Sequence, residues 1–136
     1  VSVKKADLTG FEADIKDHAD LFIQVVILAL NSRGIIRIYN CQRLRFKESD
    51  RPSAIISELK KAKAKISAGK NFIKIEKSQL NYSVLDTHND HRLAMGFAVA
   101  ALNSVSGLEI NNTKCVSKSY PGFFSEFKNL IAEIVK

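Results

Sequence analysis

Residues 35–64 read IIRIYNCQRLRFKESDRPSAIISELKKAKA, and this stretch sets the pattern for the rest of the chain. Its first five residues, Ile35–Tyr39, are mostly β-branched or aromatic, which predicts a strand. Its last part, Asp50–Ala64, repeats apolar residues at helical spacing. Pro52 falls in the first turn, where a missing N–H costs nothing, so this part predicts an amphipathic helix.

The loop between these two elements is crowded with charge. Its basic side chains are Arg43, Arg45, Lys47 and, at the start of the helix, Arg51. Cations at a helix N-terminus oppose the helix dipole, so they are not explained by folding alone. In one interpretation the loop is solvated, and Glu48 and Asp50 neutralise their neighbours. In the other, the free N–H groups of the helix start and the basic side chains bind a multiply charged anion.

The same arrangement recurs later in the chain, which favours the anion site. Asn89-Asp90-His91-Arg92 opens a second predicted helix, and Lys118-Ser119-Tyr120-Pro121 comes just before a third. Open α/β sheets bind ligands where loops follow the strands. We therefore expect these segments to line one pocket.

Composition indicates one domain, or part of one, with anionic partners. The chain has 136 residues, with 21 Lys or Arg against 14 Asp or Glu, and a net charge of +7. Nucleic acid, a membrane surface and phosphorylated metabolites all suit such a charge. Much of the excess is lysine spread over residues 60–77, which is typical of a solvated face. The clustered arginines are therefore the stronger signal.

Other features concern compartment and cofactors. Cys41 and Cys115 are expected to be free thiols in a reducing compartment. No apolar run approaches the roughly 20 residues of a membrane span, so a cytoplasmic location and no membrane partner are expected. The chain begins with Val1 instead of Met, and we expect it to be a piece of a larger protein. The Asp, His and Cys residues lack a metal-ligand spacing, so neither metal nor cofactor is expected.

Hydrophobic periodicity predicts the remaining elements. Before residue 35 come a strand over 11–15 and a mostly buried helix from Asp20 to about Asn31. After residue 64 come a hairpin over 66–75, a strand over 82–85, a helix over 93–102 that is apolar on every side, a strand over 108–110 and an amphipathic helix over 123–135. Gly96 within the apolar helix predicts close packing against a neighbour.

This order predicts an α+β fold of repeated βαβαββ units, with a mixed sheet and buried helices. The first unit would span residues 11–78, and a second, incomplete unit would span 79–136. Residues 1–136 would together form a single, partial domain.

Three blocks of the sequence resemble the motifs of a known family. They are LRFKESDR over 44–51, NDHRLAM over 89–95 and CVSKSYP over 115–121. In this order and spacing they resemble the C-terminal motifs of the 5-enolpyruvylshikimate-3-phosphate synthases, and the resemblance extends over the whole chain. It implies the enolpyruvyl transferase-like fold, in which two domains of three units each close on the substrates. This chain would hold about two units of the C-terminal domain.

The resemblance also implies a function. Such transferases move the enolpyruvyl group of phosphoenolpyruvate to the 5-hydroxyl of shikimate 3-phosphate and release phosphate, in the shikimate pathway of aromatic amino acid biosynthesis. Both substrates are polyanions, which explains a need for several fixed arginines. The missing N-terminal domain would supply the rest of the site, so the piece alone is expected to show no turnover.

For the substrate-binding residues, the resemblance to this family implies individual roles. Arg51, Arg92 and Lys118 would hold the phosphate and carboxylate of phosphoenolpyruvate. Their simpler interpretation is as surface cations. Arg43 departs from the pattern, because some family members carry an Asn there that contacts the shikimate group.

The catalytic residues implied by the resemblance are acids, a lysine and a histidine. Glu48 would transfer the proton at C3. Asp20, as a general base, and Lys47, as a cation, would lie near the 5-hydroxyl, and which of them takes its proton stays open. Asp20 could instead be a helix N-cap. His91 would donate to a substrate oxygen or orient Glu48, or else be a local hydrogen-bonding group.

Two histidines and one acid outside these roles also need an interpretation. Asp90 is expected to cap its helix rather than to touch a ligand. His18 and His88 lie in polar loops and receive no role.

The competing function is a basic RNA-binding module. The C-terminal domain of translation initiation factor three has a related βαβαββ topology, and the net charge would suit a phosphate backbone. Against it, the arginines concentrate in acid-containing loops and do not form a basic stripe with stacking aromatics. We therefore expect no nucleic-acid partner.

Overall fold

The computed structural model describes residues 2, 4 and 6–134. Its strands and α-helices are, in chain order, β1 (Glu12–Asp14), α1 (Phe22–Ala29), β2 (Ile35–Tyr39), α2 (Arg51–Lys61), β3 (Ile66–Ala68), β4 (Phe72–Glu76), β5 (Val84–Asp86), α3 (His91–Ala101), β6 (Glu109–Asn111) and α4 (Phe123–Ile134). Short 3-10 helices precede α1, α2 and α4: η1 (Ala19–Leu21), η2 (Cys41–Phe46) and η3 (Thr113–Lys118). The order matches the predicted one, except that η2 and η3 had been expected as loops and η1 as the start of the first helix.

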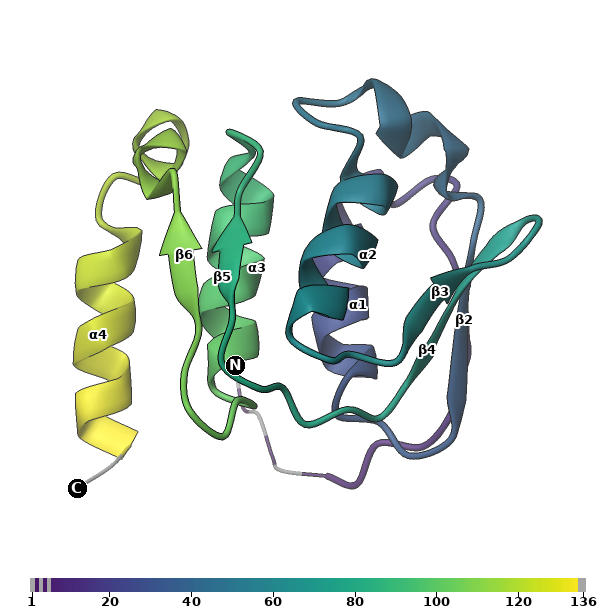
Figure 1. The fold of residues 1–136 in the computed structure, drawn as a ribbon, viewed down its shortest axis with the longest axis horizontal. Helices are drawn as coiled ribbons and strands as arrows, with labels where there is room; N and C mark the ends of the chain where they lie inside the picture. The colour runs from purple at the N-terminus through teal and green to yellow at the C-terminus, as the bar shows by residue number, and fades with distance from the viewer. Residues whose placement is uncertain (1, 3, 5, 135–136) are drawn as a thin grey trace.

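The strands form a mixed sheet and a separate pair. The four-stranded sheet has the order β1-β2-β4-β3, with β1 parallel to β2 and β4 antiparallel to both of its neighbours. Strands β5 and β6 form a two-stranded parallel sheet. Helices α1 and α2 lie between the larger sheet and the β5–β6 pair (Figure 1). This mixed sheet with buried helices confirms the predicted fold class.

Helix α2 begins where the sequence predicts and ends earlier. The Asp50 side chain accepts a hydrogen bond from the Ser53 N–H at 3.1 Å and caps the helix. Ile55 and Leu59 face the core and are fully buried. Lys63 takes a left-handed conformation with φ of 66°, so the helix stops at Lys61 and not at residue 64.

Helix α3 is not buried on every side, and that prediction was wrong. Leu93 and Phe97 are fully buried, whereas Val99 is 41% exposed. The exposed side faces an apolar groove of about 440 Å³ between α1 and α3. Gly96 does allow the close approach of the two helices, because a Cβ there would collide with Cγ2 of Ile23.

Helix α4 is amphipathic but makes little use of its apolar face. Among its side chains that the structure describes, none is buried, and Leu130 is 53% exposed. Phe123 and Phe127 stack on each other with ring centroids 5.4 Å apart. In Figure 1 the helix lies at the outer edge of the molecule, beyond β6. None of the helices in the described part of the chain is long and apolar enough to cross a bilayer.

The two parallel strand pairs end in the same way, which their sequences had not revealed. At the end of β1, both carboxylate oxygens of Asp14 accept from the Asn40 side-chain amide at 2.9 Å. At the end of β5, Asp86 accepts from the amide of Asn112 at 2.8 Å. Both asparagines have a left-handed backbone, with φ of 62° and 59°, and each leads into a 3-10 helix. These bonds fix the direction in which the loops leave the strands.

Candidate functional site

The predicted site residues lie in segments that follow parallel strands. Because β1 and β2 are parallel, and β5 and β6 are parallel, the segments leave each pair from its carboxyl edge. The loop over 40–50, the turn over 87–90 and η3 all lie along the upper edge in Figure 1. The predicted residues lie in or directly after such segments: Asp20 in η1, Lys47, Glu48 and Arg51 around the start of α2, His91 and Arg92 at the start of α3, and Lys118 at the end of η3.

Arg51 is the centre of the cluster that forms at this edge. Its side chain is only 1% exposed, although it is the first residue of α2. Its Nε donates to Oδ2 of Asp90 at 2.7 Å, and its Nη2 donates to Oε2 of Glu48 at 2.5 Å. A buried guanidinium needs such partners, since an unpaired charge in the interior is very costly.

Asp20 joins Arg51 to a second arginine. Its Oδ1 lies 3.8 Å from Nη1 of Arg51, and its Oδ2 lies 3.1 Å from Nη2 of Arg92. Arg92 also donates to the backbone carbonyl of Asp20 at 3.2 Å. We call these five residues, Asp20, Glu48, Arg51, Asp90 and Arg92, the arginine–carboxylate cluster. It draws on three segments that are far apart in the sequence.

Asp90 is the fixed acid of the cluster. It is fully buried, caps α3 by accepting from the Arg92 N–H at 2.9 Å, and accepts from the Ser49 hydroxyl at 3.0 Å. Burial by itself would raise the pKa of Asp90, but the hydrogen bond and charge of Arg51 outweigh it and hold this pKa below its ordinary value. Asp90 is therefore a carboxylate that fixes Arg51 in place.

The sequence predicted the cap at Asp90 but missed its contact with Arg51. Ser49, which also bonds Asp90, was missed as well. The signal available in the sequence was the spacing of Arg51, which lies four residues before the apolar Ile55 and so on the same face of the predicted helix. An arginine placed there requires an acid from elsewhere in the chain.

Three predicted residues are not joined to the cluster. Lys47 and Lys118 are exposed, and neither takes part in an ion pair among the residues that the structure describes. His91 is half-buried between Asp90 and Arg92 at the start of α3. Of the seven predicted side chains, the structure thus brings together Asp20, Glu48, Arg51 and Arg92.

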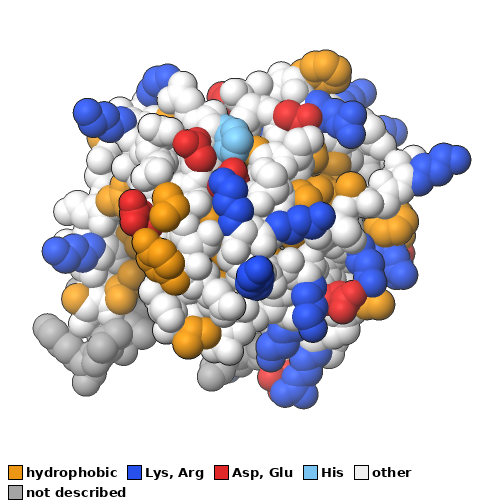
Figure 2. Space-filling view, viewed as in Figure 1, with side chains coloured by type: hydrophobic (Ala, Val, Ile, Leu, Met, Phe, Trp, Pro, Cys, Tyr) orange, Lys and Arg blue, Asp and Glu red, His pale blue; other side chains and the backbone are white. Residues whose placement is uncertain are grey.

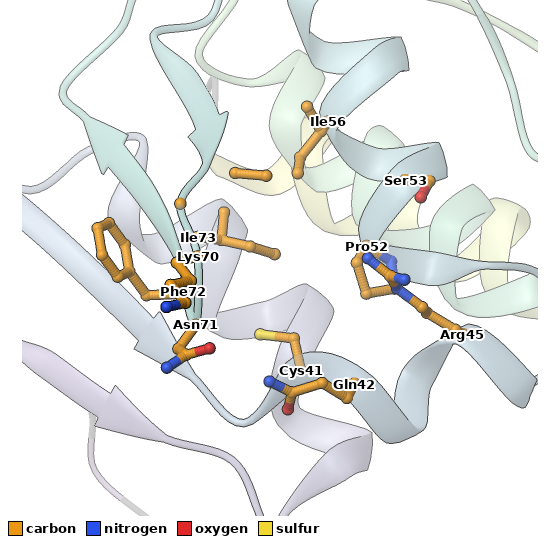
Figure 3. A pocket seen from close by; sticks show the side chains of 12 residues that line it. Cys41, Gln42, Arg45, Pro52, Ser53, Ile56, Lys70, Asn71, Phe72 and Ile73 are labelled. Carbon is orange, nitrogen blue, oxygen red and sulfur yellow. The ribbon is translucent and has the colours of Figure 1, made fainter.

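Not all basic residues of the 43–51 segment belong to the arginine–carboxylate cluster. Arg45 lines a separate, small pocket of about 100 Å³ between η2, the start of α2 and the β3–β4 hairpin. In Figure 3 its guanidinium lies beside Pro52, and the Cys41 side chain lines the same pocket. Burial raises the pKa of the Cys41 thiol to about 11, so this thiol is not a nucleophile at neutral pH.

The larger charge distribution does not form a nucleic-acid stripe on the viewed face. Figure 2 shows Lys and Arg side chains scattered over it, densest toward the lower right, with acids between them. The lysines at 60, 61, 63, 65, 70 and 77 are all exposed, as expected of a solvated face. Within the described residues, no three His, Cys, Asp or Glu side chains are grouped as a metal site would require.

A comparison with protein families bears on the two functions that the sequence left open. A family model described as EPSP synthase (3-phosphoshikimate 1-carboxyvinyltransferase) matches residues 1–127, which include every predicted site residue. The chain belongs to the EPSP synthase family. This match gives no support to the RNA-binding alternative.

Individual relatives agree with the family match. The chain is 38% identical over 134 residues to the 3-phosphoshikimate 1-carboxyvinyltransferase of Clostridium acetobutylicum, covering 98% of this chain and 31% of the relative. It is also 38% identical over 128 residues to that of Buchnera aphidicola, covering 93% and 30%. The chain therefore spans about a third of the length of these relatives.

Solved structures support the fold. The EPSP synthase of Acinetobacter baumannii superimposes with a TM-score of 0.74 and 28% identity, over 82% of this chain and 26% of that one. The enolpyruvyl transferase NikO of Streptomyces tendae superimposes with a TM-score of 0.66 over 91% of this chain and 28% of that one. At 15% identity, NikO supports the enolpyruvyl transferase-like fold alone.

Proposed function

We propose that this chain supplies the C-terminal part of the active site of an enzyme that transfers the enolpyruvyl group of phosphoenolpyruvate to the 5-hydroxyl of shikimate 3-phosphate. Phosphate is the second product. In this proposal the remaining two thirds of the relatives' length corresponds to chain that completes the site, including an N-terminal domain. We assign residues 11–78 to one βαβαββ unit and residues 79–136 to a second, incomplete one.

One observation carries the proposal: the carboxylate of Asp20 lies between the guanidinium groups of Arg51 and Arg92. These arginines come from α2 and α3, and Asp20 itself is 62% exposed. An exposed anion thus occupies the space between two cations, one of which is rigidly held. A phosphate or carboxylate of the substrate would fit the same space and accept hydrogen bonds from both arginines.

The proposed chemistry is an addition followed by an elimination. The 5-hydroxyl adds to C2 of the enolpyruvyl group while C3 gains a proton, and loss of phosphate from C2 together with a proton from C3 then restores the double bond. Glu48 would exchange the proton at C3, because its carboxylate is half-exposed and held by Arg51. Asp20, displaced from the arginines by the substrate anion, would be free to accept the hydroxyl proton.

The remaining three residues would act when the substrates are bound. Lys118 would add a third cation for the phosphoenolpyruvate anion, and Lys47 would stabilise negative charge near the 5-hydroxyl. His91 would donate to a substrate oxygen or orient Glu48. The solvent-exposed positions of Lys47 and Lys118 leave both free to move toward a ligand.

Alone, the chain is expected to bind the anion weakly and to show no turnover. The cluster is open to water on the side of Asp20, and nothing in the described residues covers it.

Two buried free thiols, Cys41 and Cys115, favour a reducing compartment, so we place the enzyme in the cytoplasm.

The test replaces the matching segment of the Clostridium acetobutylicum relative with this chain. The chimera is assayed for phosphate release from phosphoenolpyruvate and shikimate 3-phosphate. We expect release that requires both substrates and that falls by at least a hundredfold in an Arg92→Ala chimera, because a charge-assisted contact to the substrate is lost. The same replacement with the Buchnera aphidicola segment, a matched exchange, controls for the junctions. A chimera that unfolds cooperatively but releases no phosphate would refute the proposal.

A further inference from the structure

A second buried carboxylate lies on α2, two turns beyond Arg51. Glu58 is 3% exposed, whereas Lys60 and Lys61 of the same helix are exposed. Its Oε2 accepts from Nζ of Lys61 at 2.6 Å and from the backbone N–H of Asp86 at 2.9 Å. Its Oε1 lies 3.0 Å from Nε2 of His88. An ionised carboxylate only accepts, so the Nε2 of His88 carries the proton in this contact.

Glu58 therefore holds a turn that belongs to the next part of the chain. The turn over 86–90 connects β5 to α3, and two consecutive residues in it have a left-handed backbone: His88 with φ of 50° and Asn89 with φ of 58°. Left-handed conformations are unfavourable for residues other than glycine, so the turn needs contacts that hold it. Asp86 contributes one by accepting from the His88 N–H at 2.6 Å. Glu58 contributes two more contacts, to the N–H of Asp86 and to the ring of His88.

The turn leads directly into the arginine–carboxylate cluster. Asp90 ends it, and Arg92 follows in the first turn of α3. Helix α2 consequently holds this segment at two places. Arg51 binds Asp90 at one end of the helix, and Glu58 binds the N–H of Asp86 and the His88 ring further along.

We propose that Glu58, acting through His88, is a positioning residue that sets the distance between Arg51 and Arg92. This inference rests on the proposed function, because it concerns the phosphoenolpyruvate-binding part of the site. Glu58 lies roughly 10 Å further along α2 than Arg51, away from the proposed substrate site. Its bonds outside its own helix go to the turn. The distance matters because two guanidinium groups must meet one small anion together.

A purely stabilising role explains Glu58 less well. Burying a carboxylate costs several kcal/mol of hydration free energy, and the bonds to its partners typically do little more than compensate this cost. An apolar side chain at this position of α2 would pack in the core without that cost. What an apolar side chain would not provide is a set of directed bonds to the Asp86 N–H and to the His88 ring.

Two readouts test the inference. The first is the NMR signal of the Arg51 Nε–H in this chain, whose proton is buried against Asp90 and should exchange slowly. The second is the affinity of the chain for phosphoenolpyruvate and for inorganic phosphate, followed by chemical-shift titration, together with kcat and KM in the chimera. We expect Glu58→Gln to shift or broaden the Arg51 signal and to raise KM for phosphoenolpyruvate on the order of tenfold, as removal of an outer support does elsewhere.

Matched variants separate positioning from stability. Glu76→Gln makes the same chemical change in a surface ion pair with Lys74, and should leave both readouts unchanged. His88→Gln keeps a side-chain N–H donor and should stay near the wild type, whereas His88→Leu lacks the donor and should resemble Glu58→Gln. The two His88 variants keep the test decisive if the Glu58→Gln protein does not fold.

The outcomes also distinguish this inference from the proposed function. If Glu58→Gln and His88→Leu lower only the unfolding midpoint and leave the Arg51 signal and KM unchanged, Glu58 is merely structural and the inference is wrong. If the chimera releases no phosphate, the proposed function fails, while the response of the Arg51 signal to Glu58→Gln still reports whether the turn positions the cluster.

Discussion

Arg51 and Asp90 form a buried ion pair, with Nε and Oδ2 2.7 Å apart and with side chains 1% and 0% exposed. The two residues are 39 positions apart and belong to the starts of α2 and α3. Each helix start is therefore fixed relative to the other by one charged contact that water cannot reach. This pair is the rigid base on which the exposed Asp20 and the half-buried Arg92 are placed.

Removal of the Asp90 charge should strongly destabilise the chain. Asp90→Asn leaves the guanidinium of Arg51 buried without its main counter-charge, and breaking such a pair costs about 3–5 kcal/mol. The free energy of unfolding in urea measures the loss. Asp50→Asn is the matched control, since Asp50 caps α2 in solvent and Asn caps equally well, so a change of less than about 0.5 kcal/mol is expected there. Equal losses in the two variants would contradict a special role for the buried pair.

Stability should fall at acid pH because of the same pair. The folded-state pKa of Asp90 is lowered, so its contribution is fully present above its unfolded value of about 4 and is lost as the pH falls through the folded pKa. The pKa of Glu58 is also lowered, since the hydrogen bonds from Lys61, the Asp86 N–H and His88 outweigh its burial, and it acts in the same direction. Unfolding should be followed from pH 7 to 2. The slope below about pH 4 should be shallower in Asp90→Asn than in the wild type, and identical slopes would count against this account.

Asp20→Asn should raise the affinity of the isolated chain for anions while it lowers turnover in the chimera. The Asp20 carboxylate competes with a ligand for Arg51 and Arg92, and its removal leaves both guanidinium groups available. We expect several-fold tighter binding of inorganic phosphate by chemical-shift titration, in line with about 1 kcal/mol for a partly exposed ion pair. Asp7→Asn, which removes an exposed acid paired with Arg33, is the control and should change nothing. Weaker phosphate binding in Asp20→Asn would show that Asp20 is not a competitor.

Gly96→Ala should separate α1 from α3. An added Cβ collides with Cγ2 of Ile23, and overpacking of this kind typically costs about 1–3 kcal/mol despite the better helix propensity of alanine. Combining Gly96→Ala with Ile23→Ala removes the colliding methyl group, so the double variant should lose less than the sum of the two single losses. Thermal unfolding of the four proteins in this cycle measures the coupling, and strict additivity would be the contrary result.

Helices α2 and α3 were predictable from the sequence to different extents. For α2 the apolar spacing, the Asp50 cap and Pro52 predicted the start correctly, because caps and periodicity are local properties. The predicted end was too late by three residues, since the left-handed Lys63 carries no recognisable signal. For α3 the sequence is apolar all round, but periodicity does not say which faces have neighbours, and Val99 lies at the surface of a groove.

The candidate site, too, could be predicted from the sequence only in part. The sequence motifs identified the family, and with it the expectation that Asp20, Glu48, Arg51 and Arg92 share a site. They gave no indication of Ser49 or of the contacts of Glu58 and His88, because these residue types are common on surfaces and their burial depends on contacts far along the chain.

The sequence alone determined the element order, the family and the charged segments from which the cluster is built, since these depend on residue type and on spacing over a few turns. The tertiary structure decided which charges are buried, which carboxylate holds which guanidinium, and that Lys47 and Lys118 stand apart from the cluster. Electrostatic energy depends on distance and burial in space. Both are set by the packing of α2 against the turn before α3, between residues that the chain keeps far apart.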